Sequence, residues 1–214
     1  MMLDNEILDT ILRSIYVSGS ATLLASTWSI PLSYVMALSR RVEITASVIE
    51  SLVGMPTVLL GLLLYFLFSS SGPLGFLQLL YTPTAMIIGE AILITPLIIS
   101  TTFRLFRQTY NVYGEVARSL GATQVQVMNV VLRESFLGIL ASIIMGFSRA
   151  IGELGIALMV GGNIKGFTRV MTTAIALGVS RGEFESSVVL GFILLLIMIV
   201  IAILLKILGR YFRS

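Results

Sequence analysis

Arg149 and Glu153 are the residues whose types and spacing most clearly suggest chemistry, because they interrupt an otherwise apolar stretch over residues 135–160. Residues four apart share one face of a helix, so these opposite charges can pair. Either charge alone would cost about 2.5–3.5 kcal/mol in the middle of a membrane-spanning helix. The pattern fits a buried structural clamp, within the chain or across a dimer interface, or a pair that lines a polar path. We predict a clamp that also gates, rather than a direct substrate ligand.

Glu90 is the third ionisable residue in an apolar stretch, and we interpret it as the partner of a cation such as Arg149 or as a solvated group. The chain contains no cysteine and no histidine. Their absence excludes disulfides, Cys/His zinc sites, cysteine nucleophiles and histidine acid–base catalysis. No glycine cluster ends in the Gly-Lys-Ser/Thr sequence of a phosphate-binding loop, so we expect no ATP chemistry, metal or cofactor in this chain.

The composition predicts that these residues lie in an integral membrane protein. Of 214 residues, 57% are hydrophobic and 12% are charged, against roughly 45–50% and 25% in globular proteins. The mean hydropathy is +1.00 and the pI is about 9.4. A soluble domain could not bury so much apolar surface. We therefore interpret the net charge of +3 as basic residues of cytoplasmic loops and not as a nucleic-acid surface.

Long stretches without charge predict five membrane-spanning helices in a single domain over residues 1–214. The turn-forming cluster at residues 69–73 divides the longest stretch into two spans. The chain lacks the alternating pattern of a barrel strand, so the predicted fold class is an all-α integral membrane protein. The predicted spans cover about 14–39, 48–69, 83–103, 135–160 and 186–207.

The distribution of Lys and Arg favours a multi-pass orientation with the amino terminus outside and the carboxyl terminus in the cytoplasm. In that orientation most basic residues fall on the inner side: Arg40, Arg41, Arg104, Arg107, Arg118, Arg133, Lys206, Arg210 and Arg213. Fewer fall outside: Arg13, Lys165, Arg169 and Arg181. The acidic first residues differ from the basic start of a signal peptide, so we expect the first span to remain in the mature protein.

The cytoplasmic segment 104–133 is too polar to span a membrane, and its pattern predicts a helix–turn–helix lying across the ends of the spans. Gly121 is suited to end the first helix. Thr123 followed by Gln126 forms a capping box that begins a second helix carrying Val125, Met128 and Leu132 on one side. Two amphipathic helices resting on lipid headgroups would fit the pattern. A docking element for a soluble subunit would also fit.

The outer loop 161–185 begins with a Gly-Gly-Asn turn and continues with an apolar segment too short to cross a membrane. We interpret this segment as a re-entrant or interfacial helix. It could be a simple lid, or it could form part of an outer gate and a docking surface for a substrate-delivery protein. In the second case Lys165 and Arg169 would give the entrance positive charge, although charges on an outer loop are usually only solvated.

The string at residues 115–121, Glu-Val-Ala-Arg-Ser-Leu-Gly, resembles the Glu-Ala-Ala, three residues, Gly signature of ABC importer permeases. In that family the signature forms coupling helices that insert into a groove of an ATPase subunit. The chain departs from the pattern at Val116, where the signature has alanine, and at Arg133, near which many members have proline. The resemblance implies an ATPase-coupling role for Glu115, Val116, Ala117, Leu120, Gly121 and Ala122.

Further strings over about residues 51–185 resemble the tungstate and molybdate group of type I, binding-protein-dependent importers, and are most similar to tungstate permeases. They include Gly-Met-Pro-Thr from residue 54, Arg-Ala-Ile-Gly-Glu from residue 149 and Gly-Gly-Asn-Ile from residue 161. The resemblance implies a homodimer of five-span subunits with cytoplasmic coupling helices in the cell (inner) membrane. It also implies two cytoplasmic ABC ATPase subunits, which hold ATP and Mg, and an extracytoplasmic oxyanion-binding protein.

A path for an oxyanion would need hydroxyls, amides and helix amino termini, which lower the cost of burying the anion without trapping it. Residues that could line or gate it are Gly54, Pro56, Thr57, Arg149, Glu153, Gly161, Gly162 and Asn163. The resemblance favours tungstate as the substrate of an ATP-driven importer, and molybdate, sulfate and phosphate are the alternatives. A passive anion channel would explain the spans but not the coupling segment. An intramembrane hydrolase would need a Ser/Lys pair at one depth, and none is evident.

Overall fold

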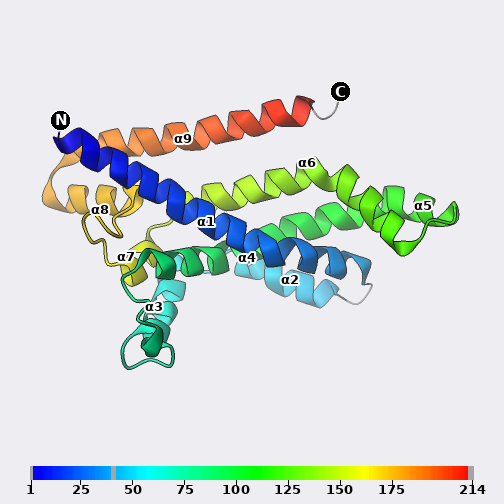
Figure 1. Cartoon of the computed structure of the whole chain (residues 1–214), viewed down its shortest axis with the longest axis horizontal. Coiled ribbons are helices and arrows are strands. Elements are labelled where there is room, and N and C mark those ends of the chain that lie inside the picture. Colours follow the sequence, from blue (N-terminus) through cyan, green and yellow to red (C-terminus); the bar gives the residue numbers. More distant parts are fainter. Residues whose placement is uncertain (1, 40–41, 212–214) are drawn as a thin grey trace.

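The computed structural model of the chain describes residues 2–39 and 42–211, and every regular element in this part is a helix (Figure 1). The predicted all-α fold is therefore confirmed. Arg40, Arg41 and Arg213, which contributed to the charge argument, lie outside the described residues. The elements are α1 (Met2–Leu38), α2 (Glu43–Leu52), α3 (Thr57–Phe68), η1 (Gly75–Leu77), α4 (Pro83–Thr109), η2 (Tyr110–Gly114), α5 (Glu115–Ser119), α6 (Gln124–Ile151), α7 (Gly155–Gly161), α8 (Met171–Arg181) and α9 (Phe184–Tyr211).

The long helices run along one axis of an elongated bundle, with α5 at one end and α7 and α8 at the other (Figure 1). We call these the hairpin end and the loop end. Helices α1, α6 and α9 and the continuous rod formed by α4, η2 and α5 are long and apolar enough to cross a membrane. The bent pair α2 and α3 would make the fifth span. This number of apolar helices agrees with the predicted fold class.

The segment predicted as the span 48–69 is a bent pair of helices. Helix α2 ends at Leu52, α3 begins at Thr57, and the two axes are bent by 91°. Pro56 precedes α3 in an extended conformation, with φ −61° and ψ 121°. Proline has no N–H to continue a helical ladder, and it disfavours helix at the residue before it. The chain therefore changes direction between Gly54 and Thr57.

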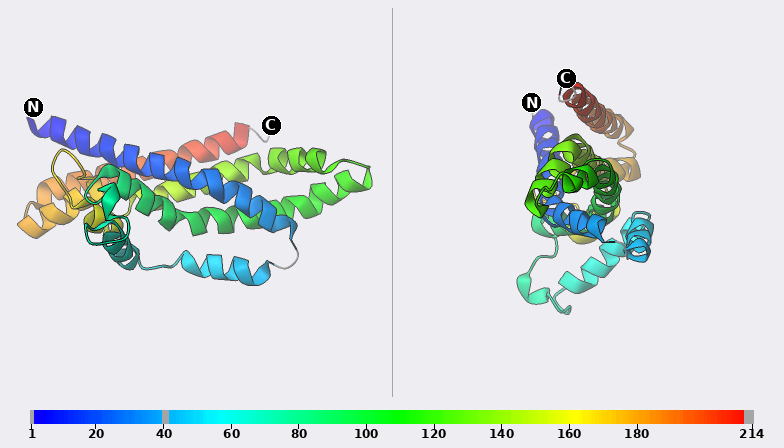
Figure 2. Two further views of the ribbon diagram at one scale, coloured as in Figure 1. Left: turned by 60° about the horizontal axis from the view of Figure 1, so that its bottom comes forward. Right: turned by 90° about the vertical axis from the view of Figure 1, so that its right-hand side faces the viewer.

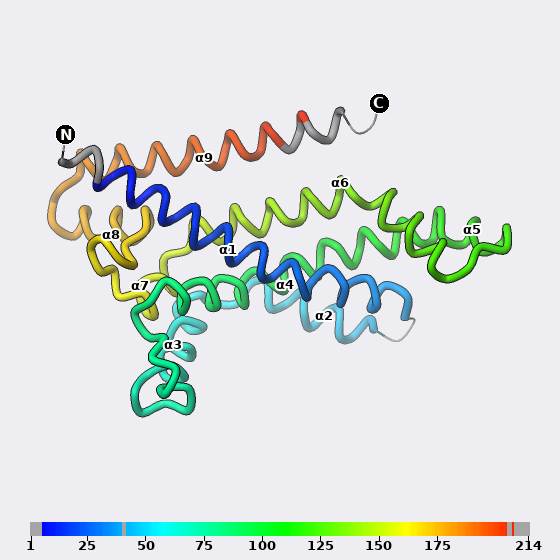
Figure 3. The backbone as a smooth tube through the Cα atoms, in the orientation of Figure 1, coloured from blue at the N-terminus to red at the C-terminus, as the bar shows by residue number. Residues whose placement is uncertain are grey.

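The predicted span 135–160 is also interrupted. Helix α6 already begins at Gln124 and ends at Ile151, and the short helix α7 begins at Gly155 (Figure 3). The first part of α6 thus belongs to the segment that the sequence placed in a cytoplasmic connection. The break at residues 152–154 lies within the stretch that carries Glu153. The second predicted span is therefore a pair of short helices, whereas the fourth is the full-length helix α6 followed by the short helix α7.

The core of the bundle is the close packing of α1 along α4 (Figure 2). Ala21 and Ala25 of α1 and Ala91 of α4 are fully buried in this contact. Small side chains let two helices approach closely in a membrane. A row of buried hydroxyl side chains follows α1 at intervals of three or four residues: Thr10, Ser14, Ser18, Thr22, Ser26, Ser29 and Ser33.

Helix α9 and the pair α2 and α3 lie on opposite sides of this core (Figure 2). Helix α9 packs on α8 and α6, and many of its apolar side chains are exposed. Helix α3 packs on α7 through Leu60, Gly61 and Leu64 while its other side is exposed. Apolar surface of this extent suits contact with lipid or with another protein.

Candidate functional site

The segment predicted to couple to an ATPase forms the tip of the helical hairpin. Helix α4 continues through η2 into α5 without a break, and a short turn then leads into α6. The tip extends beyond α1 and α2 along the bundle axis (Figure 1). This differs from the predicted helices lying across the span ends, because the second helix is the first part of the long helix α6.

Two local features close the turn at this tip, as the sequence predicts. Gly121 has a φ of +85°, a conformation that favours glycine because a Cβ strains it. Its N–H donates to the carbonyl of Arg118 at 3.0 Å. Thr123 and Gln126 then form the predicted capping box, in which each side chain bonds to the backbone N–H of the other residue at 3.4 Å and 2.8 Å.

The side chains of residues 115–122, which comprise α5 and the turn after it, divide into an outward set and an inward set. Leu120 is 83% exposed and Val116 is 57% exposed. Ala117 and Ala122 instead pack against an apolar cluster around Phe106 and Val131. In the first part of α6 the buried positions are Val127, Val131 and Ser135. Of the predicted apolar side, Leu132 packs against the same cluster, whereas Val125 is 61% exposed. An apolar leucine on a protruding tip suits insertion into a groove of another protein.

A polar pocket of about 410 Å³ lies beside this tip. Arg107, Tyr110, Asn111, Glu115 and Arg118 line it together with the end of α1. Glu115 is therefore an exposed polar residue at the base of the tip, whereas Val116 and Leu120 form its apolar surface. The residues of the signature thus differ in their surroundings: Glu115 lines the polar pocket, Val116 and Leu120 are exposed, and Ala117 and Ala122 are packed.

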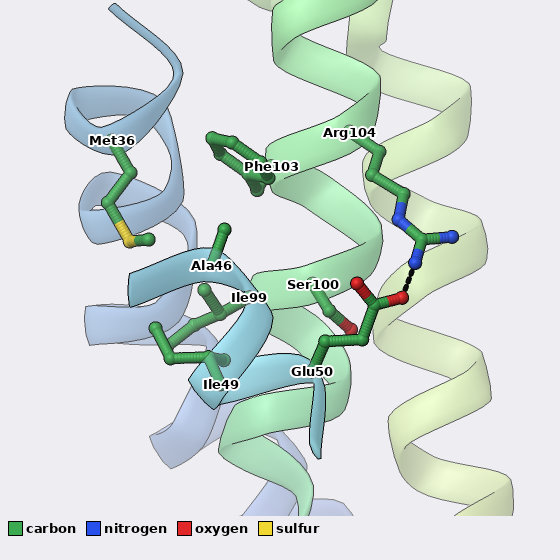
Figure 4. A pocket seen from close by; sticks show the side chains of 8 residues that line it. All are labelled: Met36, Ala46, Ile49, Glu50, Ile99, Ser100, Phe103 and Arg104. Carbon is green, nitrogen blue, oxygen red and sulfur yellow. Dashed lines mark ion pairs between the residues drawn. The ribbon is translucent and has the colours of Figure 1, made fainter. Parts of the chain in front are cut away.

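Ion pairs hold α2 against α4 near the same end. Glu50 pairs with Arg104, and Glu43 pairs with Arg107 at 3.4 Å. Figure 4 shows the Glu50–Arg104 pair at the edge of a small cavity of about 30 Å³ between α1, α2 and α4. Both pairs are largely exposed, and such pairs contribute only about 0–1 kcal/mol each. They orient α2 rather than account for the stability of the bundle.

The second candidate site lies where the two helix breaks meet. A Cβ at Gly155, the first residue of α7, would lie 2.8 Å from Oγ1 of Thr57 and 3.0 Å from the amide nitrogen of Val58. The amino termini of α3 and α7 are therefore in direct contact. Gly54 and Pro56 form the link that leads into the first of these termini. The structure thus brings Thr57 and Glu153 to one place, although they are far apart in sequence.

Arg149 and Glu153 form the predicted ion pair, with Nη1 and Oε2 separated by 3.0 Å. The other carboxylate oxygen of Glu153 accepts the backbone N–H groups of Gly155 at 2.8 Å and Ile156 at 3.3 Å. Glu153 therefore caps the amino terminus of α7, where unpaired N–H groups carry partial positive charge. Its side chain is 2% exposed, whereas that of Arg149 is 39% exposed.

Glu90 is buried on α4, and the structure does not support its predicted pairing with Arg149. Its carboxyl group faces Ser18 of α1 and lies near Glu153. Oε2 of Glu90 has no hydrogen-bond partner among the described residues, and no described ion pair includes this residue. Arg149 is engaged by Glu153 instead.

The residues predicted to form an outer gate lie at the carboxyl end of α7, whereas Gly155 is at its amino end. A Cβ at Gly161 would lie 2.7 Å from Sδ of Met86, and one at Gly162 would lie 2.6 Å from the ring of Tyr81. Oδ1 of Asn163 accepts a hydrogen bond from Arg169 at 3.1 Å. Because α7 has seven residues, it separates these groups from Gly155 by roughly 10 Å. Gly161, Gly162 and Asn163 therefore do not join Thr57 and Glu153.

The amino-terminal part of α1 holds the loop that follows α7 in place. Glu6 pairs with Lys165 at 2.7 Å and with Arg169 at 3.5 Å. Arg13 donates to the backbone carbonyls of Arg169 and Gly166, each at 2.9 Å. The carboxylate of Glu6 offsets the positive charge that the sequence analysis assigned to this entrance. The loop is thus packed on α1 instead of extending freely.

Sequence reasoning missed the hydroxyl groups that connect these elements. Thr172 donates to the carbonyl of Glu153 at 2.7 Å, so α8 braces the break between α6 and α7. Ser14 accepts the backbone N–H of Met171 at 2.8 Å, so α1 caps α8. The recurrence of Ser and Thr every three or four residues between Thr10 and Ser33 is the signal that could have revealed this face of α1.

Comparison with known proteins agrees with this architecture. Residues 29–214 match the family described as "Binding-protein-dependent transport system inner membrane component". The tungstate uptake system permease protein TupB of Peptoclostridium acidaminophilum is 40% identical over 196 residues, which are 91% of this chain and 86% of that protein. A probable anion ABC transporter permease protein of Haloferax volcanii is 35% identical over 189 residues, covering 85% and 82%. TupB of Campylobacter jejuni is 35% identical over 150 residues, covering 70% and 63%.

Proposed function

Because this chain belongs to the family of inner membrane components of binding-protein-dependent transport systems, we propose that it is the permease subunit of an ATP-driven importer of tungstate. It has the all-helical, multi-pass fold of type I ABC importer permeases. Its similarity to two tungstate uptake permeases and to an anion permease supports an oxyanion as the substrate. Molybdate, sulfate and phosphate are the alternative substrates within this class.

The observation that carries the coupling proposal is the exposed tip of the hairpin. Val116 and Leu120 project from a turn that Gly121 and the Thr123 capping box hold closed. A small apolar tip on two long helices is suited to enter a groove and to transmit a displacement along the bundle. We propose that an ABC ATPase subunit, which carries ATP and Mg, receives this tip on the cytoplasmic side.

The proposed assembly contains two copies of this chain, two ATPase subunits and an extracytoplasmic oxyanion-binding protein, within the lipid of the inner membrane. The exposed apolar sides of α3 and α9 are compatible with a second copy and with lipid. ATP binding would bring the ATPase subunits together, move the coupling tips and open the spans outward. Hydrolysis would return the path to the inward-open state.

The meeting point of the two helix breaks is the proposed location of the path. An oxyanion would cross a bare apolar interior at a very high cost in free energy. The amino terminus of α3 presents N–H groups that have no side-chain cap in the described structure, next to the hydroxyl of Thr57. Helix amino termini at broken spans stabilise anions in this way. Glu153 occupies the corresponding groups of α7, which supports a gating role and not substrate binding for that pair.

Co-purification with the ATPase tests the docking proposal. Gly121→Pro removes the N–H that bonds to Arg118 and cannot adopt a φ of +85°, and Glu115→Arg reverses an exposed charge at the tip. We expect both variants to lose the ATPase and ATP-driven uptake. Gly182→Pro is the matched control, because Gly182 also has a positive φ, of +78°, but lies near the loop end. Retention of the ATPase and of uptake by both tip variants would show that the assignment is wrong.

Uptake measured with the complete complex distinguishes the substrates. We expect tungstate uptake to resist an excess of sulfate and phosphate, and to be inhibited by molybdate only at higher concentration. The affinities of the associated binding protein for the same oxyanions provide the independent measurement. Equal inhibition by sulfate and tungstate would favour a sulfate permease.

A passive anion channel is the alternative of another class. Vesicles containing this chain without an ATPase should show no tungstate flux if the proposal is correct. Flux at the same rate with and without the ATPase would instead support a channel, and it would leave the conformation of the hairpin tip without a role.

A further inference from the structure

A π-helix, η2 (Tyr110–Gly114), lies where α4 becomes the coupling tip α5. The surrounding rod is otherwise continuous from Pro83 to Ser119. Each added residue rotates the following part of a helix by about 100°, because an α-helix has 3.6 residues per turn. A π-helical turn therefore sets which side chains of α5 point outward, and such turns frequently mark functional sites.

Two side chains and one glycine hold this turn in its conformation. The ring of Tyr110 lies over Gly114, where a Cβ would be 2.7 Å from the Cδ2 atom of Tyr110. The hydroxyl of Tyr110 accepts a hydrogen bond from Nη1 of Arg118 at 2.9 Å. Gly114 is buried, and Tyr110 also packs against the apolar cluster that contains Phe106. The contact thus spans the whole of η2 and reaches into α5.

The orientation of the tip follows from this contact. With η2 as it is, Ala117 packs inward and Val116 and Leu120 are exposed. Loss of the π-helical turn would rotate α5 relative to α4 and bring other side chains to the outer surface.

We propose that Tyr110, Gly114 and Arg118 are positioning residues that hold the coupling helix in its productive orientation and transmit its displacement to α4. This inference rests on the proposed ATPase-coupling function. It assigns to Arg118 a role within the permease, where its guanidinium fixes the Tyr110 ring, instead of a direct contact with the ATPase.

Cysteine labelling of the purified full-length chain, without the ATPase that would cover the tip, measures the orientation directly, because the chain has no cysteine of its own. We expect Val116→Cys to react faster than Ala117→Cys in the wild-type background. Adding Gly114→Ala should reduce or invert this difference, because its methyl group would displace the Tyr110 ring. Gly191→Ala is the matched control, since a Cβ there meets no atom within 4 Å.

A double-mutant cycle separates positioning from direct contact. We expect Tyr110→Phe and Arg118→Gln each to lower tungstate uptake per ATP hydrolysed by about fivefold, which corresponds to one hydrogen bond worth about 1 kcal/mol. The double variant should be no worse than either single variant. Tyr113→Phe, an exposed tyrosine of the same turn, should leave this ratio unchanged.

The outcomes distinguish this inference from the function on which it rests. If the wild-type complex binds the ATPase but the variants keep the wild-type labelling pattern and uptake ratio, the positioning role is overturned while the proposed function stands. The positioning role would also be overturned if the losses of the two single variants added up in the double variant and if Arg118→Gln, but not Tyr110→Phe, lost the ATPase. That result would assign Arg118 to the ATPase interface. A wild-type chain that binds no ATPase would overturn both.

Discussion

An arginine that precedes a glutamate by four residues is the weaker order for a helical ion pair. The structure supplies the reason for this order, because α6 ends at Ile151 and the carboxylate of Glu153 serves the amino terminus of α7. Arg149 offsets the charge of that buried cap. The position of this pair is therefore explained by the break between α6 and α7, and not by the stability of one continuous helix.

Substitutions of Glu153 should affect stability in a defined order. Glu153→Gln keeps an oxygen that can cap α7 but loses the charge that pairs with Arg149, whereas Glu153→Ala leaves buried N–H groups unpaired. Because an unsatisfied buried group costs about 1–3 kcal/mol, we expect the thermal midpoint to fall further for Ala than for Gln. Glu185→Ala, at an exposed position, is the control. Equal midpoints for the wild type and Glu153→Ala would refute the capping role.

Glu90 should tolerate loss of its charge. The residue is 2% exposed, and one carboxyl oxygen has no partner among the described residues, so a neutral side chain of the same shape suits the site. We expect Glu90→Gln to retain uptake within about twofold, since a buried charge without a cation is costly. Glu90→Lys should abolish uptake. If Glu90→Gln were inactive although normally folded, a negative charge at this position would be required for transport.

At the scale of elements, the contact between α3 and α7 is closer than side chains of ordinary size would allow. Gly61 lies against the side chain of Met159, and Gly155 lies against Thr57 and Val58. The short helices α3 and α7 are thereby in close contact, and we expect a movement of one to displace the other. The breaks in the second and fourth predicted spans accordingly form one mechanical unit near the proposed path.

Gly155→Ala tests this unit. The added Cβ would lie 3.0 Å from the backbone nitrogen of Val58, which cannot rotate away as the end of a side chain could. Overpacking of this kind typically costs about 1–3 kcal/mol. We expect tungstate uptake to fall while the ATPase remains bound, because the hairpin tip lies at the other end of the molecule. Gly191→Ala is the control and should behave as the wild type, because a Cβ at this helical glycine meets no atom within 4 Å. Normal uptake by Gly155→Ala would contradict the proposed coupling of α3 to α7.

At the scale of the whole molecule, the two ends of the bundle differ in character. The hairpin end presents a narrow tip, and the loop end is packed by contacts between α1 and the loop that follows α7. In the proposed importer the ATPase binds at one end and the substrate is delivered at the other. The distribution of basic residues then predicts that the hairpin end is the cytoplasmic one.

Single cysteines test the orientation in intact cells. Leu120 is 83% exposed at the hairpin end, and Phe76 is 77% exposed in the connection between α3 and α4. In cells that lack the ATPase, so that the tip is not covered, we expect Phe76→Cys to react with a membrane-impermeant reagent while the cells are intact, and Leu120→Cys to react only after permeabilisation. The wild-type chain, which has no cysteine, provides the blank. The opposite pattern would reverse the assigned orientation and remove the basis for ATPase docking at α5.

The amino-acid sequence by itself determined the membrane class, the all-helical fold, the turn at Gly121, the capping box at Thr123 and the pairing of Arg149 with Glu153. Each depends on composition or on residues a few positions apart, where local geometry leaves little choice. Only the tertiary structure decided that the two broken spans meet at Thr57 and Gly155, that Glu153 caps α7, and that Glu90 faces Ser18. These contacts join residues distant in sequence, and they are set by how closely whole helices can pack once small side chains allow it.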